Sequence, residues 1–93
     1  MTLRIEPFSV KSGIRIRLSG ELRSEHLDEV RTEIMRTDRR AALDLEEVDL
    51  VDVDAVRFLN ACEAQGVEVV NCSPYIRELM FQERRTEDNS ERI

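Results

Sequence analysis

The sequence predicts a small α/β domain in which a β-hairpin is followed by alternating helices and strands. Apolar and polar residues alternate over residues 3–8 and 13–19, which is typical of half-buried strands, and the linker between them is short enough for a hairpin. Beyond Gly20, segments with helical spacing alternate with short apolar runs. Because such alternation is typical of parallel strands joined by right-handed crossovers, we expect a four-stranded mixed sheet with three helices.

Length and charge limit the classes of function. The chain has 93 residues, and a second hydrophobic core would need on the order of another 100. Its 14 Lys and Arg against 20 Asp and Glu give a net charge of -6, which disfavours nucleic acid and anionic membranes and favours protein partners. No tract approaches the roughly 20 apolar residues of a membrane span, and the N-terminus lacks a signal-peptide pattern. We therefore expect a cytoplasmic protein.

The first helix is predicted over residues 24–37. Ser24 suits the N-cap position, and Glu25 places an acid in the first turn, where the helix dipole favours it. The apolar residues recur with helical spacing and form one stripe that can face the core. These residues are Leu27, Val30, Ile34 and Met35.

Two short apolar runs and the segment between them predict a βαβ unit. The runs at residues 41–45 and 67–71 are expected to be buried strands. Apolar residues with helical spacing predict a helix over 52–65, and Gly66 provides its C-terminal stop.

The last predicted helix begins at a clear signal and leads into a polar end. Ser73 can cap it, and Pro74 suits the first helical position. Residues 84–93 are almost wholly polar and bury too little surface to offset their ordering entropy. We therefore expect the domain to span residues 1–83 and residues 84–93 to form a disordered tail.

The cysteines and the histidine do not predict a metal site or a cofactor. Cys62 and Cys72 are expected to be reduced core residues, since a zinc site normally takes four soft ligands and His26 is the only other one. His26 itself lies in a charged helical stretch and is expected to be solvated.

The acids at 52 and 54 allow an enzymatic interpretation, which the rest of the chain disfavours. Residues 52–56, DVDAV, match the DxDx[TV] pattern of haloacid-dehalogenase-type phosphotransferases, where one aspartate attacks phosphorus beside magnesium. Those enzymes need further acids and a basic residue on later strands, and a cap that excludes water. No acid pair follows a strand after residue 72, no lysine occurs beyond Lys11, and the chain is too short for a cap, so we do not expect an enzyme. A calcium loop is equally disfavoured, because the glycine hinge and the bidentate glutamate are missing.

A structural interpretation explains the same acids. Asp52 fits the N-cap of the predicted helix, and Asp54 lies in its first turn. An acid there is stabilised by about 0.3 to 1 kcal/mol, because the N-terminal N–H groups are unpaired and carry positive partial charge.

Three segments in order resemble the STAS domain of anti-sigma factor antagonists. They read LSGELRSEHLDEVRTEI, then ALDLEEVDLVDVDAVRFL, then GVEVVNCSPYIRELM, and the resemblance covers about residues 3–83. It implies a module for protein-protein interaction in bacterial signalling and transcription regulation. In that family a kinase-type anti-sigma factor docks on the second strand-to-helix turn and phosphorylates a serine there.

The resemblance also implies which residues contact the partner. Asp52 matches the family's aspartate, but Val53 occupies the phosphosite position, and Asp54 and Ala55 replace the following serine and glycine. Valine cannot be phosphorylated, so we expect a surface of fixed charge, with Arg23 paired to Asp54. The implied contact residues are Gly20, Glu21, Arg23, Ser24, Asp52, Val53, Asp54, Ala55 and Arg57.

Alternative functions stay open at this point. A STAS protein can be an accessory subunit of an ABC lipid transporter, with an ABC ATPase as the partner. A small phosphotransferase that uses Asp52 and Asp54 is the second alternative, and a degenerate scaffold that has lost its partner is the third. An uncovered sheet edge after the last strand favours self-association, so a homodimer is a further prediction.

Overall fold

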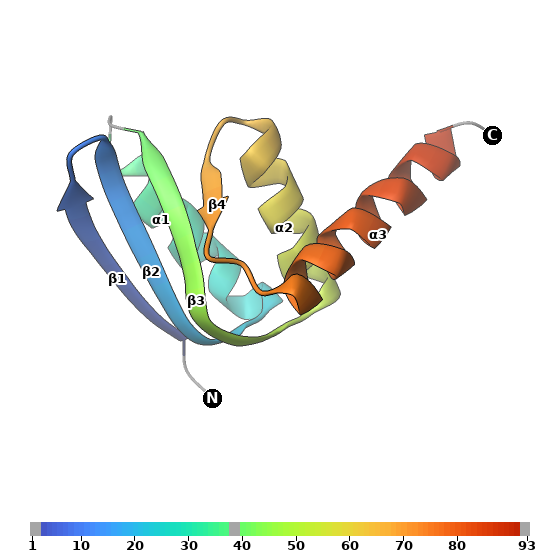
Figure 1. Cartoon of the computed structure of the whole chain (residues 1–93), viewed down its shortest axis with the longest axis horizontal. Coiled ribbons are helices and arrows are strands. Elements are labelled where there is room, and N and C mark those ends of the chain that lie inside the picture. The colour runs from blue at the N-terminus through green and yellow to red at the C-terminus, as the bar shows by residue number, and fades with distance from the viewer. Residues whose placement is uncertain (1–2, 38–39, 92–93) are drawn as a thin grey trace.

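The computed structural model of the chain describes residues 3–37 and 40–91, and four strands form one mixed sheet in this part. Neighbours follow chain order, β1-β2-β3-β4, with β1 and β2 antiparallel and the other two pairings parallel (Figure 1). The predicted sheet is therefore confirmed. The strands are β1 Leu3–Val10, β2 Gly13–Leu22, β3 Ala41–Val51 and β4 Glu68–Val70.

The three predicted helices are present, and the first begins differently from the prediction. A 3-10 turn, η1 Ser24–His26, precedes α1 Leu27–Met35, because the His26 N–H donates to the Arg23 carbonyl three residues back (2.9 Å). The other two helices are α2 Val53–Ala64 and α3 Pro74–Glu91. Over the described residues, no helix has both the length and the apolar character that crossing a membrane requires.

The core lies on one face of the sheet. Side chains that alternate along β2 and β3 pack against apolar side chains of all three helices, and α1 lies behind the sheet in Figure 1. The largest fully buried apolar side chains are Ile16, Leu18 and Leu22 of β2, Leu43 and Leu45 of β3, Val30 of α1, Leu59 of α2, and Ile76 and Met80 of α3.

The opposite face of the sheet carries arginines and one fully buried carboxylate. The Arg17 guanidinium lies 5.7 Å from the centre of the Phe8 ring and 3.6 Å from Asp44 Oδ2. Asp44 Oδ1 accepts hydrogen bonds from the Glu46 N–H (3.0 Å) and from Asn71 Nδ2 (3.2 Å). Asp44 is therefore buried with partners from its own strand and from the segment after β4.

β3 is longer than the predicted strand 41–45. Acidic residues such as Glu46 and Glu47 resemble a loop in the sequence, but both are exposed, so they remain solvated within a strand. The pairing of β2 with β3 shifts register between Arg17 and Ser19 and again between Gly20 and Glu21. These irregularities let both strands continue to the edge of the sheet where α2 begins.

α3 continues past residue 83, where the sequence predicts the ordered domain to end. The helix extends through Glu91, and beyond residue 83 the Arg84 side chain contacts Asn60 and Glu63 of α2. Residue 83 is therefore not a secondary-structure boundary. Figure 1 shows that α3 leans away from the sheet.

Both edges of the sheet have features that limit pairing with another chain. β4 has only three residues, and β1 contains Pro7, which has no N–H to donate. Self-association through a sheet edge remains a prediction.

Candidate functional site

The end of β2 and the turn from β3 to α2 lie side by side. The Ser24 N–H donates to Asp52 Oδ2 (2.8 Å), and the Asp52 N–H donates to the Leu22 carbonyl (3.3 Å). The two segments are 28 residues apart in the chain, yet parallel pairing of β2 and β3 brings them to the same edge of the sheet. The structure thus brings together the two segments that carry the contact residues implied by the resemblance.

Asp52 connects these segments through both oxygens of its carboxylate. Its backbone is extended (φ -96°, ψ 177°), and Oδ1 accepts a hydrogen bond from the Ala55 N–H (2.9 Å), as the N-cap of α2. Oδ2 accepts the bond from Ser24, at the start of η1. Both oxygens bind backbone N–H groups of the fold, which favours a structural role for Asp52 over that of a nucleophile.

Arg23 pairs with Glu21, so the predicted pair of Arg23 and Asp54 is wrong. Arg23 Nε and Nη2 lie 3.0 and 2.9 Å from Glu21 Oε1. Glu21 is two residues earlier, and the backbone at Arg23 is still extended (φ -124°, ψ 167°), so the two side chains lie on the same side of the chain. No hydrogen bond or ion pair joins Arg23 to Asp54 in the part of the chain that the structure describes.

The first turn of α2 presents two side chains to solvent. Val53 is 57% exposed, and Asp54 is exposed beside it. Ala55 is fully buried and packs into the core, so this candidate residue shapes the turn from beneath. Gly20 adopts a φ of +108°, a conformation that glycine tolerates and other residues rarely adopt.

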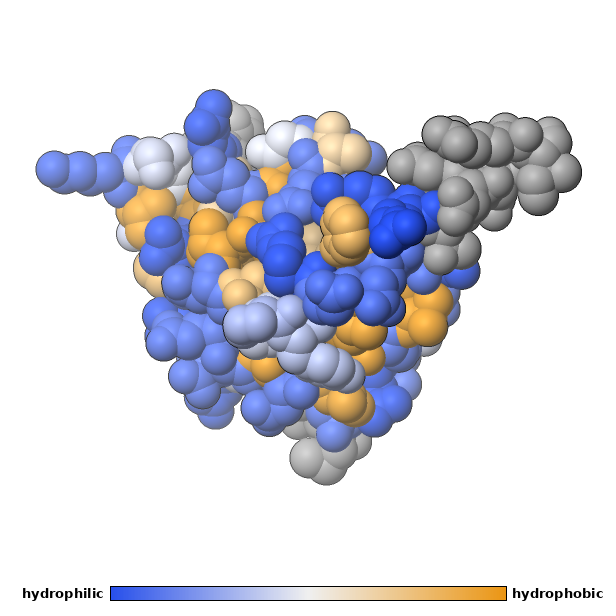
Figure 2. Space-filling model, turned by 45° about the vertical axis from the view of Figure 1, so that its right-hand side comes forward, coloured by the Kyte–Doolittle hydropathy of each residue, from blue (hydrophilic) through white to orange (hydrophobic). Residues whose placement is uncertain are grey.

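A groove lies beside this turn, between α2 and α3. The groove has a volume of about 490 Å³. Figure 2 shows that apolar residues on this side of the molecule are scattered among hydrophilic ones. The prediction from sequence missed the contribution of α3 to this region, although the spacing of Tyr75 and Leu79, four residues apart, indicates that they share one helix face. The lining residues are Val51, Asp52, Val53, Val56, Tyr75, Leu79, Gln82 and Glu83.

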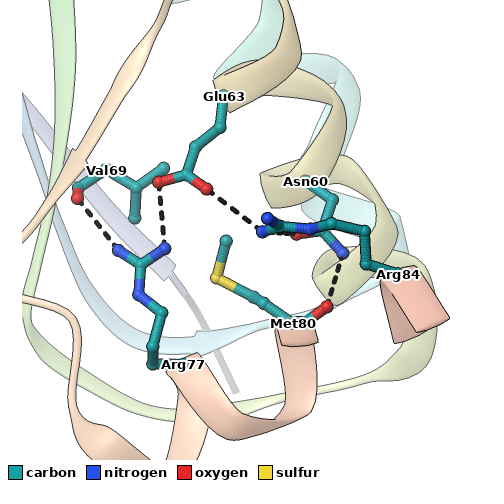
Figure 3. Close-up of polar contacts among 6 residues, drawn as sticks. All are labelled: Asn60, Glu63, Val69, Arg77, Met80 and Arg84. Atoms are coloured by element: carbon teal, nitrogen blue, oxygen red, sulfur yellow. Dashed lines mark hydrogen bonds and ion pairs between the residues drawn. The ribbon is translucent and has the colours of Figure 1, made fainter. Parts of the chain in front are cut away.

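A polar ladder holds α3 against α2 (Figure 3). The Glu63 carboxylate contacts Arg77 Nη1 (3.0 Å) and Arg84 Nη2 (3.4 Å). Asn60 accepts a hydrogen bond from Arg84 Nη2 (2.8 Å) and donates to the Met80 carbonyl (2.9 Å). Together with the buried side chains of α3, this ladder sets the position of the helix that forms one wall of the groove.

Arg57, the last of the candidate residues, also connects the two helices. Arg57 Nε lies 2.7 Å from Glu83 Oε2, which lines the groove. The arginine is therefore already engaged with an acid of its own chain.

Burial and local hydrogen bonding account for the positions of the histidine and the two thiols. His26 Nδ1 accepts a hydrogen bond from the Arg23 N–H (3.2 Å), and only 12% of its side chain is exposed, so the prediction of a solvated histidine is wrong. Both cysteines are free. Burial raises the pKa of the Cys62 thiol to about 11 and also raises the pKa of the half-buried Cys72. Within residues 3–37 and 40–91, no group of three or more His, Cys, Asp or Glu could hold a metal ion.

The architecture is that of a small STAS-like domain, so the predicted fold is confirmed. The solved structure described as the anti-sigma factor antagonist SpoIIAA in its unphosphorylated form superposes with a TM-score of 0.62, over 99% of this chain and 100% of that one. The two chains share 20% sequence identity. No protein-family model matches the sequence, and a search of curated proteins finds no match.

Proposed function

We propose that the protein is a non-catalytic STAS-type interaction module of bacterial signalling, with a kinase-type anti-sigma factor as its partner in the cytoplasm. The fold shared with an anti-sigma factor antagonist supports this proposal. The contact surface that we propose consists of residues 20–24 and the first turn of α2. The observation that carries it is the double hydrogen bonding of Asp52, which joins both segments while Val53 and Asp54 point to solvent.

The charge of this surface is fixed in our proposal. Val53 has no hydroxyl, so no kinase can phosphorylate this position, and no Ser or Thr occurs between Thr37 and Ser73. A serine at the start of a helix would carry nearly two negative charges when phosphorylated and no charge when unmodified. Asp54 instead supplies one negative charge permanently. Binding would then be regulated through the abundance or the state of the partner.

Capture of partners with a charge-reversed variant tests the surface. We expect immobilised protein to retain a kinase-fold protein from a lysate of the source cells, and Asp54→Lys to lose it. Glu68→Lys is the matched control, because Glu68 is an exposed acid on β4 that pairs beside Ala42, at the opposite end of β3. Equal retention by both variants would contradict the proposed surface. If the protein instead retains an ABC ATPase, and Asp54→Lys no longer does, the accessory-subunit alternative is supported.

A further inference from the structure

We infer that the groove between α2 and α3 receives a segment of the partner protein that inserts apolar side chains and carries Lys or Arg at its flank. This inference rests on the proposed function and deepens it, since the groove is continuous with the first turn of α2. Asp52 and Val53 belong to both.

The groove offers exposed apolar surface to such a segment. Val53 and Tyr75 are 57% and 54% exposed and face it from opposite helices, and Val56 and Leu79 also line it. Burial of this surface favours association, and exposed tyrosine is enriched at the centres of protein interfaces.

The openness of the groove favours a protein segment over a small ligand. Sites for small ligands enclose most of the surface of the molecule that they bind. Val53 and Tyr75 are each more than half exposed and belong to different helices, so the groove is walled by two helices and open to solvent between them. A partner that lies along both helices could cover the same side chains completely.

The charges of the groove identify the chemistry of that partner. Its lining contains two acids, Asp52 and Glu83, and no base. Glu83 is neutralised by its ion pair with the nearby Arg57, so Asp52 and the exposed Asp54 of the first turn of α2 supply the net negative charge at the groove and its rim. The whole chain carries a net charge of -6. A basic flank is therefore complementary to the rim, whereas an acidic or phosphorylated segment would be repelled.

Both walls of the groove are in place before binding. The Asp52 cap holds the start of α2, and the buried side chains of Ile76 and Met80 hold α3, with the Glu63 contacts in addition. A preformed groove avoids the entropy that ordering a wall would cost on binding, so a short segment can suffice.

Titration with synthetic peptides tests the inference on the full chain. The probe is an amphipathic helical peptide of leucine and lysine, compared with its glutamate-for-lysine counterpart and with a peptide of the same composition in scrambled order. NMR spectra of the labelled protein report the site and the affinity. We expect the lysine peptide to shift amide signals of residues 51–56 and 75–83, and the other two peptides to bind at least about tenfold more weakly.

Two matched variants decide whether the groove is responsible. Tyr75 and Phe81 lie on the same helix and are 54% and 52% exposed, but only Tyr75 lines the groove. We expect Tyr75→Ala to weaken binding of the lysine peptide about tenfold and Phe81→Ala to change it by less than about twofold. Equal effects of the two variants, or equal binding of the three peptides, would overturn the inference. Concentration-dependent shifts of the same signals without peptide would also overturn it, because a second copy would then occupy the groove.

The partner-capture experiment separates this inference from the proposed function. If Asp54→Lys loses the partner and Tyr75→Ala retains it, the contact surface stands and the groove is rejected. Loss of the partner in both variants supports both proposals. If neither variant loses it, both are rejected.

Discussion

Two aspartates, at either end of the exposed acidic part of β3, have the same local chemistry and different surroundings. Asp44 accepts a hydrogen bond from a backbone N–H two residues later, and Asp52 accepts one from three residues later. Each also contacts a segment far away in sequence, Asn71 for Asp44 and Ser24 for Asp52. In both places one carboxylate stabilises a local turn and connects it to a distant segment.

Their surroundings separate the two carboxylates. Asp44 is completely buried beside the Arg17 guanidinium, so its carboxylate is surrounded by other groups of the protein and is not accessible to a partner. Asp52 is half-buried, and the residues that follow it, Val53 and Asp54, are exposed. The comparison shows that a capping acid becomes part of a candidate contact surface only where its neighbours reach solvent.

Removal of the buried carboxylate should have the largest effect on stability. Asp44→Ala leaves the Glu46 N–H and Asn71 Nδ2 without their acceptor and the partly exposed Arg17 without its acid. We expect the free energy of unfolding to fall by about 3 kcal/mol in urea denaturation followed by circular dichroism. Asp49→Ala is the control, since Asp49 is an exposed aspartate of the same strand, and its effect should stay within about 0.5 kcal/mol. Similar losses of stability in both variants would show that the buried contacts of Asp44 stabilise the fold no more than an exposed aspartate does.

Removal of the second carboxylate should cost less, because its site is closer to water. We expect Asp52→Ala to lower the free energy of unfolding by about 1.5 kcal/mol, which is in the upper part of the range for a lost N-cap because the bond from Ser24 is lost as well. Hydrogen exchange provides a more specific readout: the amides of Ser24 and Ala55 should lose protection together. Asp54→Ala should leave both amides protected. Loss of protection at Ala55 alone would contradict the connection between the two segments.

The polar ladder between α2 and α3 should contribute the least of these groups. Glu63 contacts two arginines that are each about half exposed to solvent, and such pairs are worth about 0 to 1 kcal/mol. Glu63→Gln should therefore lower stability by less than about 1 kcal/mol, with Glu78→Gln on α3 as the control. A loss comparable with that of Asp44→Ala would mean that the ladder, and not the buried side chains, holds α3 in place.

The two cysteines allow the same comparison between a buried and a half-buried side chain, with reaction rate as the readout in place of stability. The thiolate is the reactive form, and a raised pKa keeps a thiol protonated. Because the pKa of Cys62 is about 11 and the side chain is buried, we expect it to resist iodoacetamide at pH 8, whereas the half-buried Cys72 reacts first. Mass spectrometry of the Cys62→Ser and Cys72→Ser variants measures each rate, and the Cys62 rate should rise as the pH approaches 11. Faster reaction at Cys62 would contradict its burial.

Elements of the fold were predictable where the local pattern is strong. Alternation over residues 3–8 and 13–19 predicted the hairpin, and Ser73 with Pro74 predicted the start of α3, where the Ile76 N–H donates to Ser73 Oγ (3.2 Å). The end of β3 was not predictable, because its exposed acids have low strand propensity. They form a strand there because β2 extends alongside them.

The sequence by itself determined the order of the elements, the capping role of Asp52 and the absence of a hydroxyl at position 53. These properties depend on spacing and on the chemistry of single residues. Only the tertiary structure decided that Arg23 pairs with Glu21, that Asp44 is buried, and that Tyr75 faces Val53 across a groove. Such contacts depend on how strands and helices pack across long separations in the chain, and local sequence patterns carry little information about that packing.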